Sequence, residues 1–280
     1  MDVVVGVDRL TPAHGRLYVV VGVFDGLHRG HRYLLTRLRR AAAAHDARPA
    51  VITFDAHPDE IVVGAAPPLL CDPDERLARL AGSGVEVCVV QHFDAALRMT
   101  EYDAFVARIA ARVELAGFLM TPDAAFGHDR RGTPAALAAL GDRTGFDVTV
   151  VDSLALDGHP VRSASIRSAI AAGDLATAGH LLGRPVAVSG DVDRDRLTFP
   201  VPVALPPAGR YRAMVEPAWT PAGRVGPARR TVVEVDADRV NLAPGTGDRL
   251  GRRARVALGP RLPEAAKPAI LRRSKKKTFR

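Results

Sequence analysis

Two histidines, His28 and His31, stand where a strand-like run at residues 17–23 gives way to a helical pattern. The first backbone N–H groups of a helix have no partner within it and, together with the helix dipole, attract anions. Gly26 and Gly30 let the backbone approach a ligand closely. Exchange of a phosphoanhydride bond requires positioning and stabilisation of negative charge, which two imidazole donors at a helix N-terminus can supply. The pattern predicts a nucleotidyltransferase site that holds the phosphates of ATP.

Two other interpretations of the histidine pair stay open. One histidine could cap the helix while the other is incidental, or both could bind a metal ion, although the sequence suggests no third ligand nearby. All four lysines lie at Lys267 or later, which excludes a P-loop lysine or a Schiff-base lysine from the first 266 residues. Any phosphate bound there must be contacted by arginine, histidine and backbone N–H groups.

Short β-branched runs alternate with Ala- and Leu-rich helical patterns through about the first 180 residues. This alternation indicates an α/β domain of the Rossmann-like type, with a parallel sheet covered on both faces and ligands beyond the carboxyl ends of its strands. The predicted strands are residues 17–23, 51–54, 85–90 and 148–151, and the predicted helices are residues 31–45, 73–81, 102–114 and 134–140.

After Gly183 the helical periodicity stops and prolines become frequent. The short β runs that follow indicate a small antiparallel β-barrel domain. The predicted division is a nucleotidyltransferase domain at residues 1–184, a barrel at residues 185–264 and a basic tail at residues 265–280. The predicted barrel strands are residues 186–188, 210–215, 231–235 and 253–258.

The formal net charge of +8 is concentrated in the tail, where residues 272–280 carry six positive side chains and no acid. The tail could bind nucleic acid, but we favour a solvated chain end and small molecules as the partners.

Cys71 and Cys88, without a secretory signal pattern, indicate a reducing cytoplasm. The sequence has no apolar run of about 18 residues and predicts no membrane span. It leaves the oligomeric state open.

The motif Gly22-Val-Phe-Asp-Gly-Leu-His-Arg-Gly-His resembles the G-x-F-D-G-x-H-x-G-H motif of the bacterial bifunctional riboflavin kinase/FAD synthetases. The likeness covers about residues 17–190, and the order of its blocks is more specific than the histidine motif alone. It implies transfer of AMP from ATP to FMN, with Mg²⁺, giving FAD and pyrophosphate. The further blocks, in the family's order, are residues 51–58, 93–105, 126–132, 163–167 and 181–185.

The resemblance also implies roles for individual residues. His28 and His31 would contact the phosphates of ATP, and Arg167 would hold them from the opposite side, a role that suits a forked guanidinium. No side chain is assigned as a metal ligand. The other implied nucleotide contacts are Gly22, Phe24, Asp25, Gly26, Gly30, Arg162 and Ser163. The residues implied for the flavin side are Phe54, His57, Asp123 and Phe126.

The chain departs from the family pattern at the phosphate-binding helix and in the flavin loop. Arg162 and Ala164 stand where the family has a serine and a threonine. Ala124 replaces an aromatic residue, whose stacking would contribute about 1 kcal/mol. These changes leave an alternative open, a nucleotidyltransferase that acts on another phosphorylated acceptor or uses another nucleotide.

The kinase half departs further. The family's P-T-A-N segment is replaced by Pro-Val-Pro-Val at residues 200–203, so the Thr and Asn that serve the nucleotide and Mg²⁺ are gone. Glu234 falls near the family's catalytic base, but a base without those ligands should do little. The sequence predicts weak or absent riboflavin kinase activity, and a barrel that serves as packing, an oligomer surface or a lid.

Overall fold

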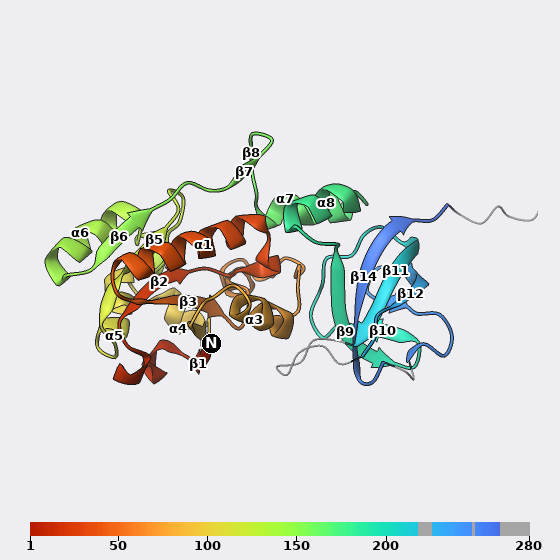
Figure 1. The fold of residues 1–280 in the computed structure, drawn as a ribbon, viewed down its shortest axis with the longest axis horizontal. Coiled ribbons are helices and arrows are strands. Elements are labelled where there is room, and N and C mark those ends of the chain that lie inside the picture. The colour runs from red at the N-terminus through yellow and green to blue at the C-terminus, as the bar shows by residue number, and fades with distance from the viewer. Residues whose placement is uncertain (218–225, 248–249, 264–280) are drawn as a thin grey trace, which may run out of the picture.

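The computed structural model describes residues 1–217, 226–247 and 250–263. Within them the chain forms a six-stranded parallel sheet with helices on both faces and a closed six-stranded antiparallel barrel, joined by a pair of helices (Figure 1). This confirms the predicted fold class. None of the described helices combines the length and apolar character needed to cross a bilayer. The predicted basic tail lies outside the described residues.

The strand order of the parallel sheet reverses at β2. The chain runs outward from β2 through β3 and β4 and then crosses to the other side of β2 to form β5. In an open α/β sheet such a switch point leaves a ligand crevice at the carboxyl ends of the strands. In spatial order the strands are β1 (Asp2–Val5), β4 (Val87–Gln91), β3 (Arg48–Phe54), β2 (Leu17–Val21), β5 (Leu115–Met120) and β6 (Asp147–Val150).

Two hydrophobic layers bury the faces of this sheet. α1 buries Leu35, Leu38 and Ala42, a spacing of three and four residues that forms one helical face, against Tyr18 and Val20 of β2. Residues of α5 and α6 cover the opposite face. The helices are α1 (Arg29–Ala44), α2 (Pro58–Val62), α3 (Pro73–Ala81), α4 (Ala95–Arg98), α5 (Tyr102–Ala110) and α6 (Pro134–Thr144), followed by the joining pair α7 (Ser163–Ala171) and α8 (Leu175–Leu182).

The barrel stands beside the α/β part, on the side of α3 (Figure 1). Its interior is filled by aliphatic side chains and the fully buried ring of Tyr211. A short hairpin, β7 (Ala155–Leu156) and β8 (His159–Pro160), precedes α7. The barrel strands are β9 (Ala187–Asp193), β10 (Arg196–Thr198), β11 (Gly209–Pro217), β12 (Arg229–Val235), β13 (Val240–Asn241) and β14 (Arg253–Arg261).

The element predictions hold where local signals are strong. α3 has its predicted bounds, because Asp72 caps it and Pro73 occupies its first position. The helix predicted for residues 102–114 instead ends at Ala110, since Val113 is buried in the core and β5 begins two residues later. The prediction also missed the strands β1, β5, β7, β8, β10 and β13. β5 has no β-branched residue and is buried on both faces, so neither propensity nor alternation marks it.

Candidate active site

A strained turn connects the carboxyl end of β2 to the N-terminus of α1. Gly22 still pairs with β3, where its N–H donates to the carbonyl of Ile52 at 3.0 Å. Phe24 (φ 54°), Gly26 (φ 77°) and Leu27 (φ 38°) then adopt left-handed conformations. Such backbone costs a non-glycine residue about 1–2 kcal/mol, and strain of this kind concentrates at functional sites. The turn delivers the H-x-G-H segment to the switch point of the sheet.

The two histidine rings lie face to face at this turn. Their centroids are 3.6 Å apart and their planes are inclined by 16°. Nδ1 of His28 accepts a hydrogen bond from the backbone N–H of His31 at 3.2 Å and so caps α1. A neutral His28 therefore carries its proton on Nε2, where it can donate to a ligand. Nδ1 of His31 is buried and has no hydrogen-bond partner among the described residues.

Burial keeps both imidazoles neutral near pH 7. Together with the positive charges of Arg184 and Arg167, burial lowers the pKa of His28 to about 4. Burial and the neighbouring His28 hold the pKa of His31 well below its ordinary value. The free site therefore offers neutral N–H donors, and a bound triphosphate would raise both pKa values because it favours the charged form.

A cavity of about 310 Å³ opens over the histidines. The N-termini of two helices border it, α1 with His28 and Gly30 and α7 with Ser163. In the described part of the chain no side chain caps α7, so its first N–H groups stay available to a ligand. A Cβ on Gly30 would lie 2.9 Å from the carbonyl oxygen of Val161, so only glycine permits this approach. Two convergent helix N-termini make the cavity suited to a phosphate chain.

Most of the predicted nucleotide residues line this smaller cavity. Asp123, predicted for the flavin side, also lies on its wall, and its carboxylate pairs with the guanidinium of Arg162 at 2.9 Å. Tyr33 of α1 lines the cavity as well and was not anticipated. The predicted residues that the structure brings together here are Gly22, Phe24, His28, Gly30, His31, Asp123, Arg162 and Ser163.

A second cavity, of about 630 Å³, adjoins the first. The two share Val21, Gly22, Leu34 and Thr121 as lining residues, so they meet at the carboxyl end of β2. The larger cavity is mostly apolar with a few polar groups, as is typical of sites for small organic ligands. A ligand that occupies both cavities would therefore place an apolar body in one and a phosphate group near the histidines in the other.

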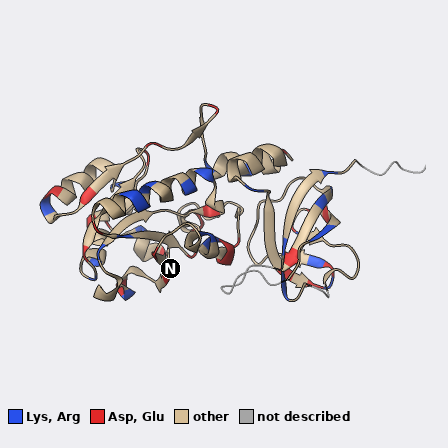
Figure 2. Ribbon diagram, viewed as in Figure 1, with Lys and Arg blue, Asp and Glu red and all other residues tan. Residues whose placement is uncertain are grey.

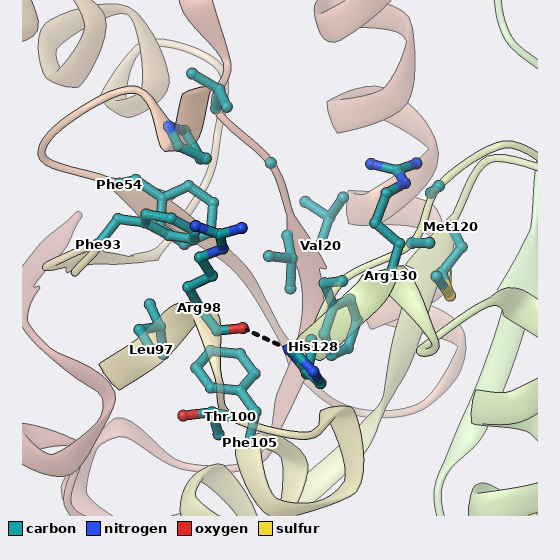
Figure 3. A pocket seen from close by; sticks show the side chains of 18 of the residues that line it. Val20, Phe54, Phe93, Leu97, Arg98, Thr100, Phe105, Met120, His128 and Arg130 are labelled. Atoms are coloured by element: carbon teal, nitrogen blue, oxygen red, sulfur yellow. Dashed lines mark hydrogen bonds between the residues drawn. The ribbon is translucent and has the colours of Figure 1, made fainter. Parts of the chain in front are cut away.

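Aromatic rings dominate the wall of the larger cavity. Phe54 and Phe93 lie together on one side of it (Figure 3), in an edge-to-face contact with centroids 5.4 Å apart. Phe126 lines it too, packed at 5.8 Å against the ring of Phe118. His57 completes the set of predicted flavin residues that reach this cavity. Rings arranged in this way favour a planar aromatic ligand.

Several residues of the larger cavity were not anticipated. Arg98, His128 and Arg130 bring polar groups to it, and Nδ1 of His128 donates to the carbonyl of Arg98 at 3.4 Å (Figure 3). His128 and Arg130 lie within the motif at residues 126–132, which was the available signal. Phe93 and Arg98 follow β4 and belong to the block at residues 93–105, but that block assigned no role to either of them.

Arg167, Asp25 and Gly26 lie behind the cavities and are not among the described residues that line them. Nη2 of Arg167 is 2.6 Å from Oδ2 of Asp25, and its Nε donates to the carbonyl of Pro68 at 2.7 Å. Burial raises the pKa of Asp25, and the charge of Arg167 opposes this rise. Arg167 therefore supports the turn that carries Asp25, and its contact with the phosphates of ATP stays a prediction.

Comparison with known proteins identifies a family that this chain resembles. The FAD synthetase family matches residues 10–165. The bifunctional riboflavin kinase/FMN adenylyltransferase of Pseudomonas fluorescens is 33% identical over 193 residues, which are 69% of this chain and 62% of that protein. The protein of the same name from Escherichia coli K12 is 32% identical over 195 residues, again 69% and 62%. The matched part of the chain thus spans less than two thirds of the length of these relatives.

A solved structure shows the same fold over nearly the whole chain. It is a Streptococcus pneumoniae protein described as a macrolide-efflux protein, with a TM-score of 0.78 and 23% identity, and the match covers 97% of this chain and 94% of that one. At this identity the likeness concerns the fold alone. The family match, in contrast, extends over more than half of the chain and contains the H-x-G-H turn. The chain therefore belongs to the FAD synthetase family.

Proposed function

We propose that this chain is an FMN adenylyltransferase, which transfers AMP from ATP to the phosphate of FMN and forms FAD and pyrophosphate. Membership of the FAD synthetase family supports this reaction, and the relatives named above carry FMN adenylyltransferase in their names. The observation that carries the proposal is the junction of two cavities at Gly22, one suited to phosphates and one to an aromatic ring. These features favour FMN over another phosphorylated acceptor.

In the proposed reaction a phosphate oxygen of FMN attacks the α-phosphorus of ATP. The bond from that phosphorus to the oxygen bridging the β-phosphate breaks, and pyrophosphate leaves. Negative charge builds on the phosphoryl oxygens, and the Nε2–H of His28 and the N-termini of α1 and α7 are the donors that border it. The flavin ring packs among the rings of the larger cavity, with its phosphate directed toward Gly22.

We further propose that Mg²⁺ accompanies ATP. No group of three or more His, Cys, Asp or Glu side chains in residues 1–217, 226–247 and 250–263 is placed to hold a metal ion. Mg²⁺ in phosphoryl-transfer sites is commonly held through the substrate phosphates and one or two carboxylates. Asp123, on the wall of the smaller cavity, is a carboxylate in a suitable position. Bound there, the ion would neutralise charge on the phosphates.

We propose that riboflavin kinase activity is weak or absent. The segment that replaces P-T-A-N is engaged elsewhere, because the carbonyl of Pro202 and the N–H of Ala204 pair with Leu69 of the α/β part. Glu234 is exposed on β12. Riboflavin and ATP with Mg²⁺ should therefore give little FMN. FMN formation as fast as FAD formation would contradict this.

We also propose a nucleotidyltransferase domain at residues 1–184 and a barrel domain at residues 185–264. This division is supported by the end of α8 at Leu182 and the start of β9 at Ala187. A cytoplasmic location is proposed too, in keeping with the free thiols of Cys71 and Cys88.

The adenylyltransferase proposal is tested by incubating the protein with FMN, ATP and Mg²⁺ and following FAD by chromatography. His28→Asn should lower the rate by about 100-fold or more, because asparagine can still cap α1 but lacks the imidazole donor. His180→Ala is the matched control, since His180 is exposed on α8. Wild-type protein at micromolar concentration that forms no FAD would reject the proposal.

A further inference from the structure

A segment of the barrel pairs with the α/β part next to the active-site turn. The backbone N–H of Leu69 donates to the carbonyl of Pro202 at 2.9 Å, and the N–H of Ala204 donates to the carbonyl of Leu69 at 2.9 Å. Leu69 and Val203 thereby form a parallel β-bridge. Leu70, the next residue, packs in a cluster that contains Ala204 and side chains of α7 and α8. The barrel thus holds one end of residues 69–72.

The other end of residues 69–72 is held by ion pairs. Arg253 of β14 pairs with Asp72, which caps α3, and with Asp74 at 3.0 Å. Deeper in the interface, Arg255 of β14 pairs with Glu75 of α3 at 3.3 Å, and both side chains are nearly buried. Figure 2 shows acidic residues at the end of α3 that faces the barrel, and Figure 1 shows β9 and β14 on that side.

Residues 69–72 in turn hold Asp25. The N–H of Leu70 donates to both carboxylate oxygens of Asp25, at 3.0 and 3.1 Å, and the N–H of Cys71 donates at 3.3 Å. The backbone N–H of Gly26 points back to Sγ of Cys71 at 3.3 Å. These contacts fix the turn that precedes His28.

Asp25 also fixes the second helix N-terminus of the site. Its carboxylate pairs with Arg167 of α7, and its carbonyl accepts a hydrogen bond from Oγ of Ser163 at 3.2 Å. The N-termini of α1 and α7 are therefore set relative to each other through one buried carboxylate. A continuous series of contacts leads from the barrel through residues 69–72 to that carboxylate.

We propose that the barrel is a positioning element of the adenylyl-transfer site, acting through residues 69–72 on Asp25 and so on the two helix N-termini. The inference rests on the proposed function. Arg253 and Ala204 are positioning residues, because they act on the site only through other residues. On this view the barrel remains necessary for FAD formation even though its own kinase segment is altered.

Two pairs of full-length variants test the proposal. Arg253→Gln removes the charge that holds Asp72, and its control Arg239→Gln removes ion pairs that lie within the barrel. Ala204→Pro removes the backbone N–H that donates to the carbonyl of Leu69, and its control Ala204→Gly keeps that N–H. Three properties of each variant are measured well below its melting temperature. They are hydrogen exchange at the Leu70 and Cys71 amides, ATP affinity by calorimetry, and kcat and KM for FAD formation.

Arg253→Gln and Ala204→Pro should speed exchange at the two amides by about tenfold, weaken ATP binding and lower kcat at least several-fold. FMN affinity should change less than ATP affinity, because the described hydrogen bonds connect residues 69–72 to the rings of the larger cavity indirectly, through Arg76, whose Nη2 donates to the carbonyl of Phe54 at 2.8 Å. Arg239→Gln should match wild type in all of these measurements. Ala204→Gly keeps the N–H but loses the methyl group of the Leu70 cluster, so it should lie much closer to wild type than Ala204→Pro does. A lower melting temperature with unchanged amide exchange, ATP affinity and kcat would overturn the proposal. If the wild type forms no FAD, the proposed function fails, while exchange and ATP affinity still decide whether the barrel positions the site.

Discussion

Replacing Arg167 by methionine should destabilise the protein strongly while keeping much of the side-chain volume. The guanidinium lies 2.6 Å from the carboxylate of Asp25, and the two side chains are only 18% and 3% exposed. Charges about 4 Å apart attract by about 4 kcal/mol at an effective dielectric constant of about 20. Breaking a buried pair costs about 3–5 kcal/mol, because the remaining charge stays buried. At about 2–4 °C per kcal/mol, the melting temperature should fall by about 6–20 °C.

This loss should depend on pH with a definite sign. Burial raises the pKa of Asp25 and Arg167 opposes that rise, so the pKa should rise further in Arg167→Met. A carboxyl whose folded pKa exceeds its unfolded value stabilises the fold below the unfolded pKa. That stabilisation is lost as the pH rises through the folded pKa. The difference in melting temperature between wild type and variant should be smallest near pH 4 and grow toward pH 8.

Thermal unfolding followed by circular dichroism between pH 4 and pH 8 measures both effects. Asp25→Asn combined with Arg167→Met is the matched control, because asparagine can still accept from the N–H groups of Leu70 and Cys71 without a charge. If this pair recovers stability but not the rate of FAD formation, the charges of Asp25 and Arg167 serve the reaction beyond their effect on folding. A single variant that melts within about 2 °C of wild type would refute the energetic reasoning.

Three further outcomes are expected. Gly26→Ala should lower both the melting temperature and kcat, because its Cβ would lie 2.9 Å from Cβ of Leu70 at a φ of 77°; an unchanged melting curve would contradict this. Relative to His28→Asn, wild-type stability should fall as the pH drops from 6.5 toward 4, because the folded pKa of His28 is about 4 and the unfolded chain binds the proton first; denaturation curves that stay parallel over this range would exclude it. Ala124→Phe should tighten FMN binding about fivefold, as added stacking contributes about 1 kcal/mol; weaker binding in a fluorescence titration would show that the cavity has no room there.

How much of the fold the sequence could predict depends on how local each signal is. The start of α3 follows from Asp72 and Pro73 alone. β5 depends on burial between α1 on one face and α5 and α6 on the other. That burial is a property of the assembled layers, so the residues of β5 alone do not predict a strand. The closure of the barrel likewise required β10 and β13. These strands are three and two residues long, too short to show the alternation of apolar and polar residues that predicts a strand.

The same distinction applies to the site. His28, Gly30 and His31 belong to one continuous turn, so their spacing alone predicted that they lie together, and all three line the smaller cavity. The pair of Arg167 and Asp25 spans 142 positions, and no residue type predicts which distant charge will be its partner. A family motif could therefore assign Arg167 to ATP, yet only the fold shows that the free protein already engages its guanidinium behind the cavities.

These pairings bear on how a site without lysine would hold the proposed triphosphate. The two arginines predicted for the nucleotide are each paired with a carboxylate, Arg167 with Asp25 and Arg162 with Asp123, and burial keeps both imidazoles neutral. The free cavity is therefore less positive than its arginines suggest, and its fixed donors are the N–H groups of two helix N-termini. Such donors act only if the helices keep their mutual orientation, and the carboxylate that sets this orientation is the one reached from the barrel. The ordering of Asp25 thus matters to the proposed chemistry as much as the identity of the histidines.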